Sequence, residues 1–555
     1  MEIYLDANAT TAVLPQARAA ALAAMADGFG NPSSSHTSGL RARALLDGVR
    51  ASTRRVLGAG GGQLLFTSGA TEGIQTAVLS ALASLRARDA DADAGPAPTL
   101  LLYGATEHKA VPEALRHWNA LLGLRLQVLA IPVGRDGRHD LNWLRAHAPR
   151  AGLVCTMAAN NETGVISDLD GIAEALAGSP ALWMVDSVQA LGKLALRLAD
   201  TRIDYAPFSG HKAGAPKGIG VLYVRAGAPL TPLLAGGGQE GALRSGTENM
   251  PGIAAFGAVV AAIEEGRLFA DRDTLGAWRE RLSAALQDVF PGLVFNAPAQ
   301  VSLPTTLNFS VPGYGSTQLL DLFDAAGIRV SGGSACSAAR AEPSHVLDAM
   351  GLPAWQAVSA IRLSFSPMSD AGFIEQACER IRSCAESLRR HGHGAAVDGL
   401  HAAPLTLQTA ADLETTPING DLQTGAVTDA STCEVSPAAL HALLLACPAT
   451  RLVDVREPFE AVLGGELVGL PRLPASQRQQ VPLSELSQAL DGWLALPADS
   501  PVVFFCRSGQ RSAKAAVALR RLGHAQAWSL AGGLALWPAV GPAQAAPPDR
   551  AALPS

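Results

Sequence analysis

Several residue types are scarce in this 555-residue chain, and each scarcity excludes a class of protein. Charged residues make up 17% and hydrophobic residues 48%, a balance typical of a globular chain and not of a disordered one. The net charge of −6 argues against a protein that binds nucleic acid through a basic face. The longest apolar stretch, 251–263, is too short to cross a bilayer, and no signal peptide is evident, so we expect no membrane partner.

Cysteine and lysine are also rare. The seven cysteines are an odd number and form no pair of CxxC units, which favours a reducing cytoplasm over a disulfide framework and predicts no metal site. Any lysine chemistry must use one of five residues: Lys109, Lys193, Lys212, Lys217 and Lys514.

The length predicts about three folding units. Residues 1–390 alternate alanine-rich helical stretches with apolar runs at 64–67, 99–103, 153–157, 182–186 and 219–224. Because several of these runs are apolar throughout, we expect an α/β domain with a mostly parallel sheet that is covered on both faces. Strands at 307–311 and 362–365, with a helix over 370–390, predict a second, smaller lobe, and 86–98 is expected to be an exposed loop.

A change of composition separates the first domain from the rest. Residues 391–434 hold six acidic residues and no lysine or arginine, which predicts a flexible acidic linker. From 435 to 545 regular patterning resumes, with a helix near 437–446, strands at 451–455 and 501–505, and a helix from Ser512. We expect a small α/β domain here, followed by a tail at 546–555.

Two motifs of the first domain suit phosphate binding and the covalent chemistry of a lysine amine. The strand at 64–67 leads through small residues to Ala70 and Thr71, which predicts either a phosphate-binding helix N-terminus or an ordinary cap. Lys212 follows Ser209 and His211 and is either a Schiff-base lysine or a solvated surface residue.

Other motifs also have a functional and a structural interpretation. Asp186 ends an apolar strand and faces either a ligand crevice or a helix start, and His108 is either a proton carrier or a structural histidine. Arg362 could bind a substrate carboxylate or lie on the surface. Cys336 lies among glycines and serines, a setting that suits a nucleophile better than a packing residue.

Together these motifs resemble one family in order and spacing: YLDANATT, GNPSSSH, FTSGATEG, TEHKAV, NNETGVI, VDSVQALGK, SGHKAGAPKGIG, GGGQEGALRSGTEN, SGGSACSA and SAIRLSF. They resemble the cysteine desulfurases, fold-type I pyridoxal-phosphate enzymes related to the aminotransferases, over roughly residues 1–390. The chain departs from the family pattern at Ala215, where a glycine is usual.

The resemblance implies a role for each matched residue. Lys212 would carry pyridoxal 5'-phosphate, Asp186 would pair with its pyridine nitrogen, and His108 would stack on the ring and serve in acid and base steps. The other implied contacts are Asn161 and Gln189 on the ring-oxygen side, Ala70, Thr71, Ser209 and His211 on the phosphate, Thr247 on the phosphate of the neighbouring subunit of a homodimer, and Arg362 with Asn161 on the substrate. Cys336 would attack the sulfur of L-cysteine, leaving a persulfide and releasing alanine.

The small domain carries a second cysteine motif. Cys506 follows an apolar strand and precedes Arg507, Ser508, Gly509, Gln510 and Arg511, which open a helix. Backbone N–H groups and two arginines in such a loop favour a thiolate or a persulfide anion, whereas a buried apolar cysteine fits this setting poorly. The loop, LVDVRE and the later AGG resemble a single rhodanese domain over about 435–545, although 464–480 lacks the family's usual histidine.

We therefore expect a desulfurase fused to a rhodanese-like sulfur acceptor, which passes sulfur from Cys336 to Cys506 and on to acceptor proteins. As a coil, the 391–434 linker would reach roughly 35–40 Å, about one domain diameter. The alternatives are a selenocysteine lyase, a cysteine β-lyase, a rhodanese domain that uses thiosulfate independently, and a sulfur carrier without catalysis. The sequence does not identify the final acceptor.

Overall fold

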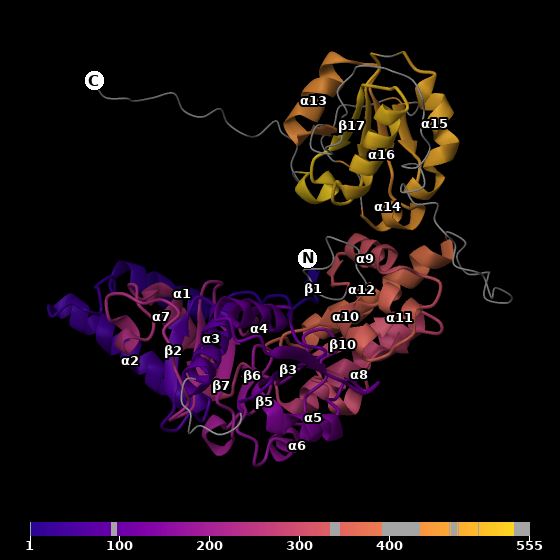
Figure 1. Cartoon of the computed structure of the whole chain (residues 1–555). Coiled ribbons are helices and arrows are strands. Elements are labelled where there is room, and N and C mark those ends of the chain that lie inside the picture. The colour runs from indigo at the N-terminus through magenta and orange to yellow at the C-terminus, as the bar shows by residue number, and fades with distance from the viewer. Residues whose placement is uncertain are drawn as a thin grey trace, which may run out of the picture. The chain divides into compact units, whose positions relative to one another are not determined.

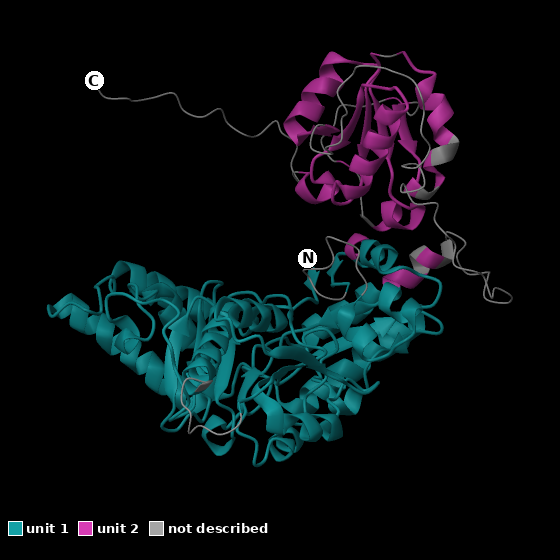
Figure 2. Cartoon of the chain, viewed as in Figure 1, with its two compact units in different colours: residues 1–323, 327–382 teal, residues 324–326, 383–555 magenta. Residues whose placement is uncertain are grey.

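The computed structural model describes residues 2–89, 97–332, 344–390, 433–464, 467, 474, 477–497 and 499–537. The chain divides into two compact units, 1–323 with 327–382 and 324–326 with 383–555 (Figure 2). Each unit is built around its own sheet (Figure 1). Residues 391–432 of the predicted linker, the tail and Cys336 lie outside the described residues. The predicted linker end at 434 is wrong, because Glu434 pairs with Ser529 in the first strand of the second unit.

The first unit contains a seven-stranded sheet in the order β2-β8-β7-β6-β5-β3-β4. Its strands are β2 (Gln63–Thr67), β3 (Leu100–Gly104), β4 (Gln127–Ile131), β5 (Ala151–Met157), β6 (Leu182–Asp186), β7 (Tyr205–Ser209) and β8 (Gly220–Val224). Only β8 runs antiparallel to its neighbours, so the predicted mostly parallel sheet is confirmed. In such a sheet the parallel strands all end at one edge, where ligands of α/β proteins bind.

A smaller lobe completes this unit. It contains the antiparallel strands β9 (Val294–Phe295), β10 (Thr306–Ser310) and β12 (Ile361–Ser364). A short parallel pair, β1 (Ile3–Tyr4) and β11 (Ile328–Arg329), ties the start of the chain to this lobe. The N-terminal segment therefore passes from the small lobe to the strand ends of the large sheet.

Helices cover both faces of the large sheet. Helices α3 (Ala70–Asp89) and α4 (Ala110–Leu121) pack on one face, and the other face is covered by α1 (Pro15–Ala26), α2 (Thr37–Val56), α5 (Leu141–His147), α6 (Leu169–Ala175) and α7 (Met250–Glu265). The remaining helices of the unit are α8 (Arg272–Val289), α9 (Ser316–Ala325), α10 (His345–Ala349), α11 (Ala354–Ser359) and α12 (Ala371–Arg390). Burial on both faces explains why β5 is apolar or small at almost every position.

One sequence prediction for this unit is wrong in part. Residues 86–89, predicted to begin an exposed loop, form the last turn of α3. Arg86 and Arg88 in that turn interact favourably with the negative end of the helix dipole, which supports the longer helix. Within the described part of the chain, no helix combines the length and the hydropathy that a bilayer crossing needs.

The second unit is a five-stranded parallel sheet in the order β13-β17-β16-β14-β15. Its strands are β13 (Glu434–Val435), β14 (Arg451–Asp454), β15 (Arg478–Gln480), β16 (Val502–Phe505) and β17 (Ala527–Leu530), and its helices are α13 (Pro437–Ala446), α14 (Pro458–Gly464), α15 (Leu486–Leu494) and α16 (Gln510–Arg521). Alternate residues of β16 face two separate apolar clusters, so this sheet also is covered on both sides.

A buried ionisable pair lies at the end of β3. Glu107 and His139 are 2% and 8% exposed, and among the described residues neither side chain has a well-formed hydrogen bond. Both pack against Gly104, where a Cβ atom would lie 2.3 Å from His139 Nε2 and 3.3 Å from Glu107 Oε1. Burial, reinforced by Asp186, raises the pKa of Glu107 well above its usual value, and burial lowers the pKa of His139 to about 4.

The His139 pKa predicts a loss of stability in acid. The folded pKa of about 4 lies below the ordinary value of about 6.5, so the unfolded chain binds more protons between these limits. The free energy of unfolding should therefore fall as the pH drops from about 7 to about 4. His139→Leu should remove about 3 kcal/mol of that loss, measured by urea unfolding at several pH values. The exposed His117→Leu is the control, and an equal pH slope in wild type and H139L would contradict the prediction.

Candidate active site

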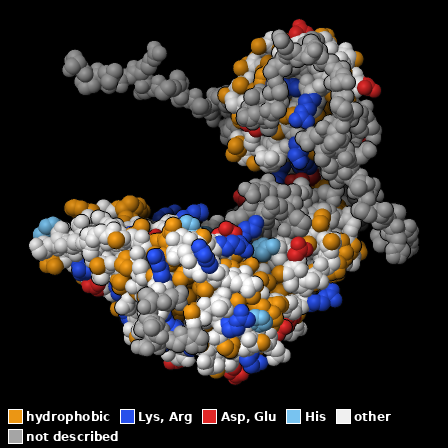
Figure 3. Space-filling model, viewed as in Figure 1, with side chains coloured by type: hydrophobic (Ala, Val, Ile, Leu, Met, Phe, Trp, Pro, Cys, Tyr) orange, Lys and Arg blue, Asp and Glu red, His pale blue; other side chains and the backbone are white. Residues whose placement is uncertain are grey.

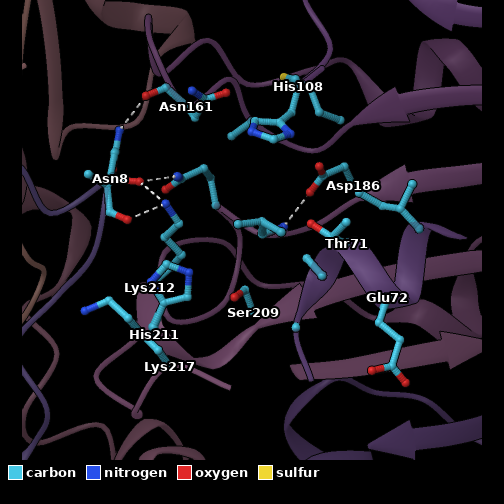
Figure 4. A pocket seen from close by; sticks show the side chains of 18 of the residues that line it. Asn8, Thr71, Glu72, His108, Asn161, Asp186, Ser209, His211, Lys212 and Lys217 are labelled. Carbon is cyan, nitrogen blue, oxygen red and sulfur yellow. Dashed lines mark hydrogen bonds between the residues drawn. The ribbon is translucent and has the colours of Figure 1, made fainter. Parts of the chain in front are cut away.

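The largest set of predicted site residues lines one cavity of about 460 Å³, a volume typical of small-ligand sites (Figure 4). The cavity lies where β2, β3, β5, β6 and β7 end, because each of these strands is followed by lining residues. The predicted residues that it brings together are Ala70, Thr71, His108, Asn161, Asp186, Gln189, Ser209, His211, Lys212 and Arg362.

Lys212 lies in the 3₁₀ turn η3 (Gly210–Lys212), directly after β7. Its Nζ donates to the backbone oxygens of Asn8, at 2.5 Å, and Ala9, at 2.7 Å (Figure 4). Thr11 bonds the backbone oxygen of His211 through both its N–H and its hydroxyl group. The N-terminal segment thus holds the lysine in the cavity.

Ala215, which stands where the family usually has a glycine, causes no backbone strain. Among the described residues only Arg125, Glu240 and Ala242 are non-glycine residues with positive φ. Ala215 therefore has a conformation open to any L-residue, and its N–H donates to the backbone oxygen of Gly210 at 3.1 Å.

Asp186 and His108 lie on the same side of the cavity (Figure 4). Burial raises the pKa of Asp186, although the Val188 N–H bond at 2.9 Å and the charges of His108 and Lys212 act in the opposite direction. The protein around His108 displaces water and so lowers its pKa, and Lys212 lowers it further while Asp186 opposes the change. His108 is thus neutral at neutral pH and can accept a proton.

The start of α3 forms a cradle of backbone N–H groups at the cavity, a setting that suits an anion. Ser68 and Gly69 lead into this 20-residue helix, whose first N–H groups have no partner within the helix. A Cβ atom on Gly220 would lie 2.7 Å from Gly69 Cα, so only glycine at that position of β8 lets the turn pack this closely. Burial, followed by the charges of Lys212 and Lys217, lowers the pKa of His211 to about 4, so this residue is a neutral neighbour of the cradle.

Arg362, on β12, is 1% exposed and reaches the cavity from the small lobe. Its Nη2 bonds Asp6 Oδ1 at 2.6 Å and its Nη1 bonds the backbone oxygen of Asn161 at 3.1 Å. Among the described residues its Nε has no hydrogen-bond acceptor, so the guanidinium retains a buried donor that a ligand carboxylate could satisfy.

Thr247 lies apart from the Lys212 cavity. It is exposed and lines a neighbouring cavity of about 200 Å³ together with Ser68 and Arg244. The loop before it includes η4 (Gln239–Ala242), which Glu240 anchors through a bidentate ion pair with Arg50. Arg244 and Ser68 bond Glu72 and hold its pKa below the usual value, although burial acts against this shift.

Among the residues that sequence reasoning missed, two polar side chains bond each other at this site. Asn8, 1% exposed, donates through Nδ2 to Thr306 Oγ1 and to the Asn161 backbone oxygen. Lys193 donates to Asn8 Oδ1 at 3.0 Å and to Gln189 Oε1 at 2.7 Å. The available signal was the spacing in VDSVQALGK, where Lys193 follows Gln189 by one helical turn.

In the second unit, Cys506 ends β16 and begins the predicted loop before α16. It is buried, and its Sγ lies 3.5 Å from Ser512 Oγ. Gly509 is the N-cap residue of α16 and has a left-handed φ of 88°, a conformation that glycine adopts easily at the end of the loop. Arg511 bonds Glu460 at 3.0 and 2.7 Å, so part of the positive field expected from the two arginines is balanced by a buried carboxylate.

Comparisons with known proteins agree with this geometry. The Aminotransferase class-V family model matches residues 3–376, and the Rhodanese-like domain model matches residues 436–539. The cysteine desulfurase of Cereibacter sphaeroides is 37% identical over 389 residues, which cover 70% of this chain and 96% of that protein.

Two further proteins show the same similarity. The cysteine desulfurase of Gluconacetobacter diazotrophicus is 37% identical over 366 residues, which cover 66% of this chain and 88% of that protein. The solved structure of a NifS-like protein superposes with a TM-score of 0.61 at 32% identity. The superposition covers 70% of this chain and 100% of the NifS-like chain. The chain therefore belongs to the cysteine desulfurase family of class-V aminotransferases and carries a rhodanese-like domain after the desulfurase region.

Proposed function

We propose that this protein converts L-cysteine to L-alanine with pyridoxal phosphate held on Lys212, forms a persulfide on Cys336 and passes that sulfur to Cys506. The observation that carries the proposal is the convergence of Lys212, Asp186 and Arg362 on one cavity at the strand ends. The cysteine desulfurase family is pyridoxal-phosphate-dependent, and we infer the reaction class from membership of that family.

The donor groups of the cavity fit this cofactor. The N-terminus of α3 with Thr71, Ser209 and His211 suits the phosphate, and Asp186 suits a protonated ring nitrogen. Gln189 offers an amide N–H to the ring oxygen, and His108 offers a ring face. When bound, pyridoxal phosphate supplies an electron sink for bond changes at the substrate carbon.

The chain's own residues supply the remaining chemistry. Arg362 would orient the substrate through its carboxylate, and the neutral His108 would accept and return a proton. The C–S bond of cysteine breaks as the sulfur joins the Cys336 thiolate, and the carbon takes a proton to give alanine. The products are one alanine and one persulfide, so the atoms balance without an external oxidant.

We also propose a homodimer through the desulfurase unit, with Thr247 acting on the neighbouring subunit's phosphate site. Two features support this proposal. Thr247 is exposed beside the cavity, and apolar side chains stand exposed at the end of the unit formed by α1 and α2 (Figure 3). Leu22, Met25, Phe29 and Leu40 are all more than half exposed there, which is unusual for a surface without a partner.

Lys212→Ala should abolish the visible absorbance of the bound cofactor and sulfide release from L-cysteine, because the covalent attachment is lost. Borohydride reduction of the wild-type holoenzyme followed by peptide mapping should place the label on Lys212. A label on Lys109 or Lys217 would contradict the assignment.

Cys336→Ser should retain the cofactor absorbance but release no sulfide, because cofactor attachment needs Lys212 whereas sulfur removal needs a nucleophile at Cys336. Cys447→Ser, in the other unit, is the matched control and should keep full sulfide release. Near-normal release of sulfide by C336S would indicate a β-lyase that eliminates without a persulfide.

The sulfur relay can be tested with 35S-labelled L-cysteine in the absence of thiosulfate. Because a thiolate at Cys506 attacks the Cys336 persulfide, label should appear on Cys506 in wild type and be absent in C336S, as mapped by mass spectrometry. The tether should keep Cys506 at an effective concentration of about a millimolar. A fully persulfidated Cys336 beside an unlabelled Cys506 would instead favour an independent rhodanese activity, and Cys447 serves as the control for unspecific labelling.

A further inference from the structure

Lys193 bonds two residues that line the Lys212 cavity, although it does not line the cavity itself. Its Nζ donates to Gln189 Oε1 at 2.7 Å and to Asn8 Oδ1 at 3.0 Å. Asn8 in turn accepts the Lys212 amine on its backbone oxygen at 2.5 Å. The two lysines are therefore joined through one buried asparagine.

The bond from Lys193 decides which way the Gln189 amide points. Gln189 Nε2 donates to the Asn8 backbone oxygen at 3.1 Å while Oε1 accepts from Lys193. A reversed amide would place its NH₂ group against the ammonium and its oxygen against a carbonyl oxygen, so both contacts would be repulsive. Gln189 thus presents donor N–H groups on the side of Asn8 and the cavity.

The charges around Lys193 are mainly positive. Burial, followed by repulsion from Lys212 and Arg362, lowers the pKa of Lys193 to about 7. Arg362 is ion-paired with Asp6, and the charge of Asp186 interacts with Lys212 and His108. Because Coulomb repulsion is mutual, a charged Lys193 disfavours a second positive charge on Lys212.

We propose that Lys193 is a positioning residue of this site: through Asn8 and Gln189 it fixes the surroundings of the Lys212 nitrogen, and its charge favours the neutral form of that nitrogen. The inference rests on the proposed function only for the identification of Lys212 as the residue that binds the cofactor. It adds a second lysine to the site and gives Asn8 the role of connecting the two.

The test is a pH titration of the cofactor absorbance in the full-length holoenzyme. In K193M the pH midpoint of the absorbance change should rise by about one pH unit, a tenfold gain in proton affinity at the Lys212 nitrogen. K109M removes an equal charge from a lysine that does not line the cavity and should leave the midpoint unchanged. K193R keeps a positive charge at every pH, so its midpoint should not exceed that of wild type. Equal midpoints in K193M and K109M would overturn the inference.

A second measurement needs no variant and decides the question if K193M fails to fold or to hold the cofactor. Competitive acylation of the wild-type holoenzyme, read by mass spectrometry, should give Lys193 a reaction midpoint well below the ordinary lysine value of about 10.4, because its nitrogen is buried, and an unshifted midpoint would overturn the inference. Sulfide release from L-cysteine is measured in parallel. If wild type releases sulfide but K193M and K109M have equal absorbance midpoints, only the role of Lys193 is rejected. If wild type releases no sulfide but the absorbance midpoint of K193M is shifted, only the proposed function is rejected.

Discussion

The hydrogen bonds of Asn8 are the interactions on which the arrangement of the site depends. Its backbone and side chain together bond residues from the large sheet and the small lobe, including Lys212, Gln189 and Thr306. Its own N–H donates to Ser364 Oγ at 3.0 Å, so its polar groups are satisfied although the residue is 1% exposed. A buried polar residue is stable only when paired in this way, and removal of one partner would leave several groups unsatisfied.

The position of Asn8 and its hydrogen-bond partners follows from the topology of the sheet. Parallel strands deliver Asp186, Ser209 and the segment after β3 to one edge, and β1 brings the start of the chain to the same place. The small lobe adds Arg362 from an antiparallel strand. The cavity is therefore lined by the Asp186 carboxylate, by Lys212 and Arg362 and by the N-terminus of α3, and Lys193 bonds two of its residues from outside.

Burial is the largest influence on the pKa values of Glu107, Asp186, His108 and Lys193. The charge of Asp186 raises the pKa of Glu107 further, because two carboxyl groups in one low-dielectric region do not both ionise readily. A neutral Glu107 leaves the negative charge to Asp186, where a protonated ring nitrogen would stabilise it. In the second unit, Glu460 forms an ion pair with Arg511 and partly neutralises its charge. Stabilisation of an anion in the Cys506 loop therefore depends on backbone N–H groups as well as on side-chain charge.

The sequence by itself determined the class of both sheets, the family and the candidate residues of the site. Lys212 after β7, Asp186 at the end of β6 and Cys506 before α16 were all predictable because strand, turn and helix signals are local. The end of α3 was misjudged because helix boundaries depend on a few weak terminal interactions. Only the tertiary structure decided that Asn8 holds Lys212, 204 positions away, and that Lys193 orients Gln189. Such bonds depend on the order in which strands meet, and no local pattern encodes that order.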